Sequence, residues 1–564
     1  MVLVSHQPNE IEMTSNLNKF KQEVEESNIS FASGKLNTAI IKAAQLIGDA
    51  QNFNKEIYLL TDFQKGRLAN ENEITNLKEQ LGEQVRLYSF NYSGKDVTNF
   101  GIDELKINTQ IFEKDKPVEF EAIVNDYSGR AKENLVVSLF IDGERSAQQS
   151  LNLNRGESKT ANLEATAKKF GYSEAFVEIE EDDILQDNKR FTSFSIPEKI
   201  PVLILYDNIN DTKLVDAALR SVSEKNYFDL TLKKVEQVSG TQLSNFQVVI
   251  LVSSNFSGES DKLNQFINSG KGLIVFPSSD DNSQKFSNSL KSINISGVTG
   301  LIKTDKGQSI RFNEIDFNHP VFENIFIEEK KKQVESPDFY SYYKINPAGK
   351  GKTIISLEDE SSFLSEYSSD GGKILLFDSS PVFSWSDFPI KSIFAPLITK
   401  SVMYLSAKNR SDKSYLAGET INVNISQRTL PQIKVIKPDD NQDIINIDSQ
   451  QANNFIAYNN TSTTGNYRFL SGDKLLSVAT VNTDPAESVT QYLTEGEFED
   501  YLEKINFNGK YIPVDKNENP SQMILQARFG SELWRYFVLI AIILALVEMT
   551  IARNAKKELV EVSN

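Results

Sequence analysis

The chain has 564 residues, a formal net charge of −18, 39% hydrophobic residues and no cysteine. This length suggests about four domains at roughly 150 residues each, and the apolar content is sufficient for several hydrophobic cores. The acidic balance argues against nucleic acid as a partner because phosphate binding needs clustered Lys and Arg. The lack of thiols excludes disulfides and cysteine nucleophiles, and the two histidines, His6 and His319, are too far apart in the sequence to suggest a histidine metal site.

Residues 1–97 alternate between strand and helix patterns. The predicted elements are a strand at 2–4, a polar helix at 16–26, an amphipathic helix at 35–47 and strands at 56–62 and 85–90. Such alternation predicts a mainly parallel sheet with any ligand site at the carboxyl ends of its strands. The first residues, MVLVSHQP, lack the basic and apolar regions of a signal peptide, so we expect a strand entered midway and a missing upstream segment.

The passage LNTAIIKAAQLI…KEIYLLTDFQ resembles the second half of a von Willebrand factor A domain. In that family a Thr before the middle helix and an Asp in a strand-end TD pair help to hold a divalent cation, so the resemblance implies Thr38 and Asp62. The main ligand motif, Asp-x-Ser-x-Ser, is not in this sequence. Because two ligands do not hold a hard cation, we expect no cofactor, with Mg²⁺ bound only if the first half of the domain is present. Asp62 is otherwise expected to be a helix N-cap or turn residue.

Residues 98–197 have the pattern of an all-β sandwich. Short alternating strands are predicted at 118–124, 135–141, 146–153 and 175–179, with Asp142-Gly143 as a hairpin turn. The passages NLVVSLFIDGERSAQQSLNLNRGES and GYSEAFVEIEEDDILQDNKRFTSFSI resemble CARDB-type, immunoglobulin-like modules. The acidic run 178–183 could bind calcium, but the sequence favours a solvated hairpin edge because no Gly-spaced Asp/Asn loop surrounds the run.

Residues 198–409 return to alternating strands and helices. Strands are predicted at 202–206, 248–252, 270–276 and 372–377, and helices at 213–221 and 262–268. This order resembles class I glutamine amidotransferase-like domains, whose active members use a cysteine nucleophile and a histidine base. Ser253 and Ser254 lack the G-x-S-x-G pattern, and His319 lies in an Asn-His-Pro turn. We therefore expect a scaffold domain with no catalytic residues.

The next segments are less distinctive. Residues 384–408 have apolar side chains at helical spacing, typical of a helix that faces a core. Residues 410–484 are expected to form a small β domain. Residues 485–530 are expected to be a polar, partly helical connector that Pro513 and Pro520 interrupt.

A transmembrane helix is predicted at residues 533–552, followed by a short basic tail at 553–564. Twenty residues at about 1.5 Å each cover about 30 Å, the thickness of the bilayer's hydrocarbon core. The apolar run 536–547 is also short enough for a buried core helix, but it is apolar on every face. The predicted span begins at Leu533 and ends at Ala552. Trp534 and Tyr536 are residue types found at a membrane interface, and Glu548 lies about one turn before the end.

Three passages, WSDFPIKSIFAPLITKSVMYL, ATVNTDPAES and ELWRYFVLIAIILALVEMTIARNAKK, resemble the BatA-type (aerotolerance-operon) bacterial membrane proteins. The order of domains resembles that family over nearly the whole chain. The resemblance implies two upstream spans and a first half of the A domain, so that this chain would be N-terminally truncated.

The predicted fold class is therefore multidomain α/β plus all-β with one C-terminal transmembrane helix. We expect a membrane-anchored, envelope-facing protein that binds other envelope proteins, with its body in the bacterial periplasm and no nucleic acid or small-molecule substrate. Two alternatives remain open: a hydrolase or amidotransferase-type enzyme in residues 198–409, and a divalent-cation-dependent adhesion protein.

Overall fold

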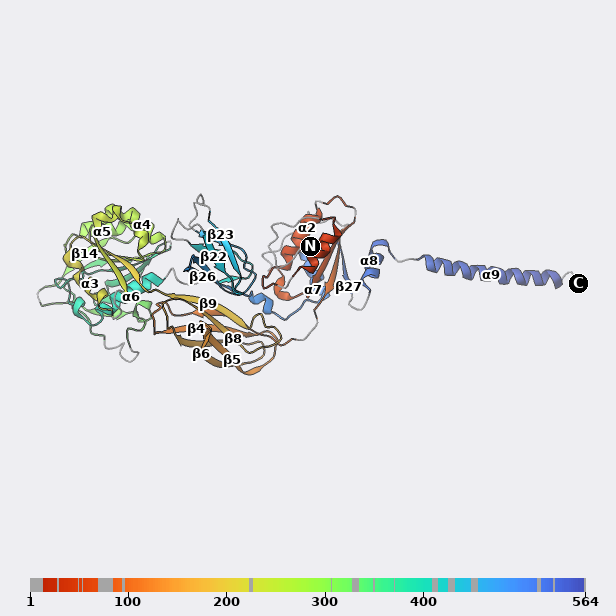
Figure 1. Ribbon diagram of the computed structural model, residues 1–564, viewed down its shortest axis with the longest axis horizontal. Helices are drawn as coiled ribbons and strands as arrows, with labels where there is room; N and C mark the ends of the chain where they lie inside the picture. The colour runs from red at the N-terminus through yellow and green to blue at the C-terminus, as the bar shows by residue number, and fades with distance from the viewer. Residues whose placement is uncertain are drawn as a thin grey trace. The chain divides into compact units, whose positions relative to one another are not determined.

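A computed structural model describes most of the chain (Figure 1). The described residues are 14–27, 30–48, 50–52, 54–68, 85–93, 97–222, 227–305, 307–326, 334–347, 350–369, 371–407, 414–424, 432–447, 455–514, 519–530 and 533–561. They divide into two compact units. Unit 1 combines residues 1–29, 33–97 and 489–564, and unit 2 combines residues 30–32 and 98–488. The architecture is mixed α/β and β, with an apolar helix at the C-terminal end.

Unit 1 contains a parallel sheet whose strands come from both ends of the chain. Its elements are α1 (Leu17–Glu25), α2 (Leu36–Gly48), β1 (Lys55–Thr61), β2 (Val85–Asn91), α7 (Glu495–Lys504), β27 (Lys510–Val514), α8 (Pro520–Phe529) and α9 (Trp534–Glu561). The order of strands in the sheet is β1-β2-β27, with Ile57 opposite Leu87 and Leu87 opposite Tyr511. The two helices and two strands predicted between residues 16 and 90 are confirmed to within two residues at each end. The strand predicted at 2–4 and His6 lie outside the described residues.

The prediction that residues 485–530 are a connector is wrong. Thr494 caps α7 through a reciprocal capping box with Glu497, and Phe498 then packs into the core formed by α2 and β1. Neither proline interrupts an element: Pro513 lies in β27, an edge strand of the described sheet, and Pro520 opens α8 at its first position. The α/β unit that begins in residues 1–97 therefore also includes a segment that follows about 390 residues of unit 2.

Residues 100–196 form the predicted sandwich. Its strands are β3 (Phe100–Ile107), β4 (Pro117–Asp126), β5 (Lys132–Ile141), β6 (Glu144–Leu153), β7 (Ser158–Thr166), β8 (Gly171–Ile179) and β9 (Lys189–Ile196). They make antiparallel sheets in the orders β3-β4-β7 and β6-β5-β8-β9, and the alternate inward side chains of both sheets form one core. Asp142 and Gly143 have positive φ angles of 51° and 85°, as the predicted two-residue hairpin turn requires.

The acidic run 178–183 ends in the hairpin connection between β8 and β9, where Glu180, Glu181 and Asp183 are exposed, in agreement with the predicted solvated hairpin edge. Asp182 accepts the backbone N–H of Phe100 at 2.7 Å, and Asp183 accepts that of Thr98 at 2.7 Å. These carboxylates hold the start of β3. Within the described residues, no cluster of three or more His, Asp or Glu side chains has the geometry of a metal site.

The largest sheet of unit 2 has the order β11-β10-β12-β13-β19-β18-β17-β15. Its strands are β10 (Ile200–Tyr206), β11 (Phe228–Lys234), β12 (Val248–Val252), β13 (Gly272–Phe276), β15 (Phe312–Ile315), β17 (Gly351–Leu357), β18 (Ser362–Ser368) and β19 (Lys373–Phe377). The first five strands in this order, β11 to β19, run parallel to one another. Each of the last three, β18, β17 and β15, pairs antiparallel with the strand before it. A separate pair, β14 (Val298–Lys303) and β16 (Ser341–Ile345), lies outside this sheet.

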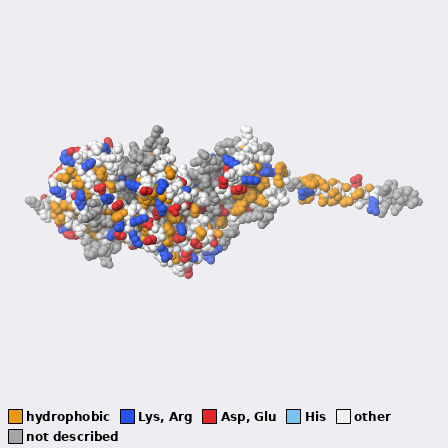
Figure 2. Space-filling model, viewed as in Figure 1, with side chains coloured by type: hydrophobic (Ala, Val, Ile, Leu, Met, Phe, Trp, Pro, Cys, Tyr) orange, Lys and Arg blue, Asp and Glu red, His pale blue; other side chains and the backbone are white. Residues whose placement is uncertain are grey.

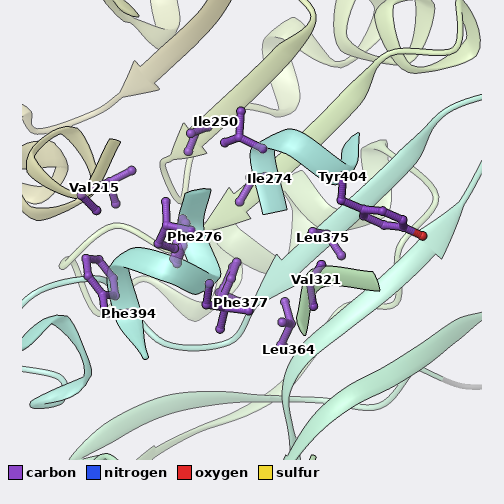
Figure 3. Close-up of a cluster of buried hydrophobic side chains, with 14 of the residues drawn as sticks. Val215, Ile250, Ile274, Phe276, Val321, Leu364, Leu375, Phe377, Phe394 and Tyr404 are labelled. Carbon is purple, nitrogen blue, oxygen red and sulfur yellow. The ribbon is translucent and has the colours of Figure 1, made fainter. Parts of the chain in front are cut away.

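Helices cover both faces of the large sheet. They are α3 (Lys213–Arg220), α4 (Ser260–Asn268), α5 (Ser283–Ser292) and α6 (Phe394–Ala407). Alternate side chains of the buried strands enter two cores, one with α3 and α6 and the other with α4 and α5. Figure 3 shows the first core, in which Phe276 and Phe377 stack at 4.2 Å and to which Phe394 of α6 also belongs. The core-facing helix predicted within 384–408 is α6.

Residues 414–482 form a small β domain. Its strands are β20 (Ser414–Leu416), β21 (Ile421–Asn424), β22 (Gln432–Ile436), β23 (Gln442–Asn446), β24 (Phe455–Tyr458), β25 (Gly465–Ser471) and β26 (Lys474–Asn482). A five-stranded sheet, β20-β26-β25-β22-β23, and the pair β21-β24 enclose one core. Phe31, from the segment between α1 and α2, packs against this core, which explains why residues 30–32 belong to unit 2.

Candidate functional sites

Polar side chains gather where the parallel strands of the large sheet end, which is the usual position of ligand sites in such folds. Asp207 follows β10, Ser253 and Ser254 follow β12, Ser278 lies two residues after β13, and Asp378 follows β19. The serines and Asp378 are buried. This carboxyl edge is therefore the first place to look for chemistry.

Hydrogen bonds at the carboxyl edge tie the serines to one another and to Asp207. The Ser253 hydroxyl donates to Asp207 Oδ1 at 2.8 Å, and the Ser254 backbone N–H donates to Oδ2 at 2.9 Å. The Ser278 hydroxyl lies 2.8 Å from that of Ser254. Burial raises the pKa of Asp207, although these hydrogen bonds oppose the rise. The arrangement links β10, β12 and β13 at their ends.

Asp378 is the most deeply buried carboxyl group of this edge. Its Oδ2 accepts the Ser362 hydroxyl, and its Oδ1 has no hydrogen-bond partner among the described residues. Burial raises the pKa of Asp378 well above its ordinary value, and the bond from Ser362 only partly offsets this. Burial thus favours the protonated carboxyl group, which can donate a proton but is a poor nucleophile.

His319 lies away from the serines. Its Nε2 is 3.2 Å from Glu366 Oε2, and its Nδ1 accepts the Val321 backbone N–H at 3.3 Å. Glu366 lies opposite Leu375 of β19, three residues before Asp378, which corresponds to about 10 Å along the strand. Within the described residues, His319 makes no hydrogen bond to Ser253 or Ser254, so no serine–histidine pair forms there.

The His319 side chain belongs to a buried charged cluster with Glu366, Lys373 and Tyr404. Tyr404 donates to Glu366 Oε2 at 2.8 Å, and Lys373 Nζ lies 3.3 Å from Oε1. Figure 3 shows the Tyr404 hydroxyl directed away from the apolar core. Burial tends to raise the pKa of Glu366, but the hydrogen bonds from His319 and Tyr404 and the charge of Lys373 outweigh it and bring this pKa to about 2.

The Glu366 cluster is expected to stabilise unit 2 above pH 4.5 and to lose this effect as the pH falls towards 2. A carboxyl group whose pKa is lower in the folded state binds its proton more weakly than in the unfolded state, so acid favours unfolding. The shift corresponds to at most about 3 kcal/mol, and solvent screening reduces it to about 2 kcal/mol. Glu366→Gln should remove this part of the pH dependence. The measurement is urea unfolding between pH 5 and about 3, followed by fluorescence.

The two tryptophans of the chain make this measurement selective. Trp385 is buried in the α/β core, and Trp534 lies on α9, so a Trp534→Phe background leaves one reporter in unit 2. Glu164→Gln, at an exposed position of β7, is the control and should leave the pH profile of unfolding unchanged. An equal profile for Glu366→Gln and the unsubstituted chain would contradict the expected role of Glu366.

The residues suggested as metal ligands lie on separate elements of unit 1. Thr38 is exposed in the first turn of α2. Asp62 is exposed directly after β1, where its Oδ1 accepts the Gln64 backbone N–H at 3.3 Å. This contact is that of a turn residue.

The membrane-span residues lie on one long helix. α9 runs from Trp534 to Glu561, and the segment Trp534–Asn554 is long and apolar enough to cross a membrane. Its most apolar window has a mean hydropathy of 2.1 and contains no buried residue. Tyr536, Glu548 and Ala552 are all in this helix, and Leu533 directly precedes it. The helix continues past the predicted end at 552 because Ala, Lys and Glu residues at 553–561 favour helix.

Sequence reasoning missed Asp207, Asp378 and the Glu366 cluster. Asp207 and Asp378 each follow a buried apolar strand directly, and that position was the available signal. The pairing of Glu366 with His319 and Lys373 had no signal in the sequence because it depends on how β18, β19 and the turn at His319 pack together.

The solved structures that are similar to this chain each cover only part of it. No protein-family model and no curated protein matches it. A solved cytoplasmic protein of Salmonella typhimurium is 14% identical, with a TM-score of 0.29 over 36% of this chain and 98% of the other. The CARDB domain of a Pyrococcus furiosus protein, solved with di-metal ions, is 16% identical, with a TM-score of 0.17 over 19% of this chain and 98% of the other. A domain of a putative cell surface protein of Methanosarcina acetivorans is 14% identical, with a TM-score of 0.16 over 18% and 94%.

Proposed function

We propose that this protein is a membrane-anchored scaffold that presents recognition modules at the bacterial envelope. The observation that carries the proposal is α9, whose most apolar window contains no buried residue. A bare apolar helix of this length is unfavourable in water and favourable in a bilayer. The antiparallel sandwich at 100–196 is of the kind that serves in recognition at cell surfaces.

The proposal extends to a BatA-type protein with an A-like unit 1 and an amidotransferase-like domain at 198–409 that acts without catalysis. The parallel order β1-β2-β27, with α2 and α7 packed into the core of unit 1, supports the A-like assignment. The binding of Ser253 to Asp207 and of His319 to Glu366 supports a structural role for these polar groups. The hydrolase alternative would need a nucleophile and base in contact, and the adhesion alternative would need further oxygen ligands beside Asp62.

The orientation that we propose places the body of the protein in the periplasm and residues 553–564 in the cytoplasm. Arg528 and Arg535 flank one end of the span, and Arg553, Lys556 and Lys557 flank the other, a bias that favours a cytoplasmic C-terminus. In the full-length protein, protease added to spheroplasts should digest the body and spare a tag placed after Asn564. Detergent permeabilisation should then expose the tag. A protected body with a digested tag would reverse the orientation.

A further inference from the structure

On the sheet face opposite α2 and α7, side chains of β1 are exposed, whereas Tyr88 of the neighbouring strand β2 is buried. Ile57 and Leu59 of β1 point to the face that α2 and α7 cover. Side chains alternate along a strand, so Glu56, Tyr58 and Leu60 point to the opposite face. Tyr58 is 42% exposed and Leu60 is 62% exposed. Large apolar side chains that remain exposed together on a sheet face indicate a contact that the isolated chain does not supply.

Helix α8 is attached to the β1 side of this face by a charged cluster. Arg528 Nε donates to Glu56 Oε1 at 2.8 Å, a second guanidinium nitrogen bonds Oε2, and the same nitrogen lies 3.0 Å from the Tyr58 hydroxyl. The Glu56 side chain is only 8% exposed. The hydrogen bond from Arg528, opposed by partial burial, lowers the pKa of Glu56 and so keeps it charged for this contact. The cluster therefore fixes α8 relative to β1.

The same helix adds two apolar side chains to the surface. Leu525 and Phe529 are one turn apart on α8 and are 52% and 81% exposed. Tyr58, Leu60, Leu525 and Phe529 are here called the open face. Figure 2 shows a continuous area of hydrophobic side chains on this part of unit 1.

The chain itself limits how far the open face can be from a membrane. Five residue steps join Phe529 to Trp534, the first residue of α9, and an extended chain of that length reaches at most about 17 Å. Trp534 and Tyr536 are residue types that settle at the bilayer interface. With α9 in a bilayer, Phe529 therefore lies within about 17 Å of the headgroup layer.

We propose that the open face rests on the headgroup layer of the bilayer that holds α9, and this rests on the proposed membrane anchor. Four side chains are far fewer than the 20–30 residues a side of a stable protein interface, so a second copy is a poor occupant. Within the described residues β1 is an edge strand, and its free backbone groups need water or headgroups, which limits the depth of the contact. Arg528 is already neutralised by Glu56, so the contact is apolar and independent of anionic lipid.

The absence of cysteine from the sequence permits a direct test in the full chain. Single variants Leu60→Cys and Phe529→Cys, each carrying a nitroxide label, are reconstituted in phosphatidylcholine vesicles. Accessibility to oxygen, which concentrates in lipid, is compared with accessibility to a water-soluble nickel chelate. Ile444→Cys on β23 is the matched control because Ile444 is 66% exposed, close to the 62% of Leu60. Leu539→Cys, within α9, reports the anchor.

The expected ratio of oxygen to nickel accessibility is several-fold higher at positions 60 and 529 than at 444, and phosphatidylglycerol in the vesicles should not change it. A lipid signal at 539 with water signals at 60 and 529 would overturn the docking and leave the anchor intact. Labels at 60 and 529 shielded from both reagents would also overturn it, because a protein surface such as the exposed stripe Leu17, Phe20 and Val24 of α1, or a second copy, would then cover the open face. A water signal at 539 would reject the anchor and the docking together.

Discussion

Ending the chain at residue 532 is expected to move the protein from the membrane pellet to the soluble fraction. The deletion removes all of α9, whose most apolar window has a mean hydropathy of 2.1. Insertion of such a helix is effectively irreversible, whereas a peripheral contact through a few apolar side chains is weak. The open face proposed above therefore should not hold the truncated chain once α9 no longer concentrates it at the bilayer. Fractionation after an alkaline wash, with detection of an N-terminal tag, measures the change.

The matched control for this deletion is a chain that ends at residue 554. It lacks Lys556 and Lys557 of the tail but keeps the whole apolar segment Trp534–Asn554, so it should remain in the pellet after the wash. A truncated chain of residues 1–532 that also stays in the pellet would show that the membrane association lies elsewhere in the molecule.

Local patterns in the sequence predicted the α/β and β regions well where each element buries a regular set of side chains. Strand β12 begins and ends at the predicted residues, 248 and 252, because all five of its side chains are buried and apolar. In the sandwich, the alternation of apolar and polar residues predicted β5 and β8 because only one face of each sheet meets the core.

The assembly of unit 1 was not predictable from local patterns in the same way. The capping box at Thr494 and Glu497 and the helical spacing of Phe498, Tyr501 and Leu502 are visible in the sequence and indicate a helix. Nothing local shows that this helix and β27 join strands from residues 55–91, because that pairing closes around an inserted unit. The polar composition of 485–530 favoured a connector, and the tertiary pairing of β27 with β2 decided otherwise.

The candidate sites depend even more on tertiary packing. Ser253 and Ser254 could be placed at a strand end from the sequence, but their partner Asp207 lies 46 residues away on a neighbouring strand. The open face likewise needs Arg528 of α8 to meet Glu56 of β1, 472 residues apart in the chain. Among these features, only the apolar helix was predictable from local sequence, because its length and composition alone make it able to cross a bilayer.

Phe498→Ala is expected to destabilise unit 1 by about 3–5 kcal/mol, the usual cost of removing a fully buried phenyl ring. Phe498 is 0% exposed, and its ring lies 4.7 Å from that of Phe63 after β1 and 5.5 Å from that of Tyr511 in β27. The ring therefore joins the two halves of the discontinuous unit. Hydrogen exchange measured by mass spectrometry should become faster in peptides that cover β1, β2 and β27.

The matched control is Phe20→Ala in the same unit, where the ring is 41% exposed on α1 and its removal should cost no more than about 0.5 kcal/mol. Exchange in the α/β core around Trp385 should stay unchanged in both variants because that core belongs to unit 2. If α7 and β27 were only a connector, Phe498→Ala would behave like Phe20→Ala. If residues 495–514 share a core with β1 and β2, Phe498→Ala opens a cavity in that core and hydrogen exchange in both strands becomes faster. Unchanged exchange in β1 and β2 would therefore contradict the shared core.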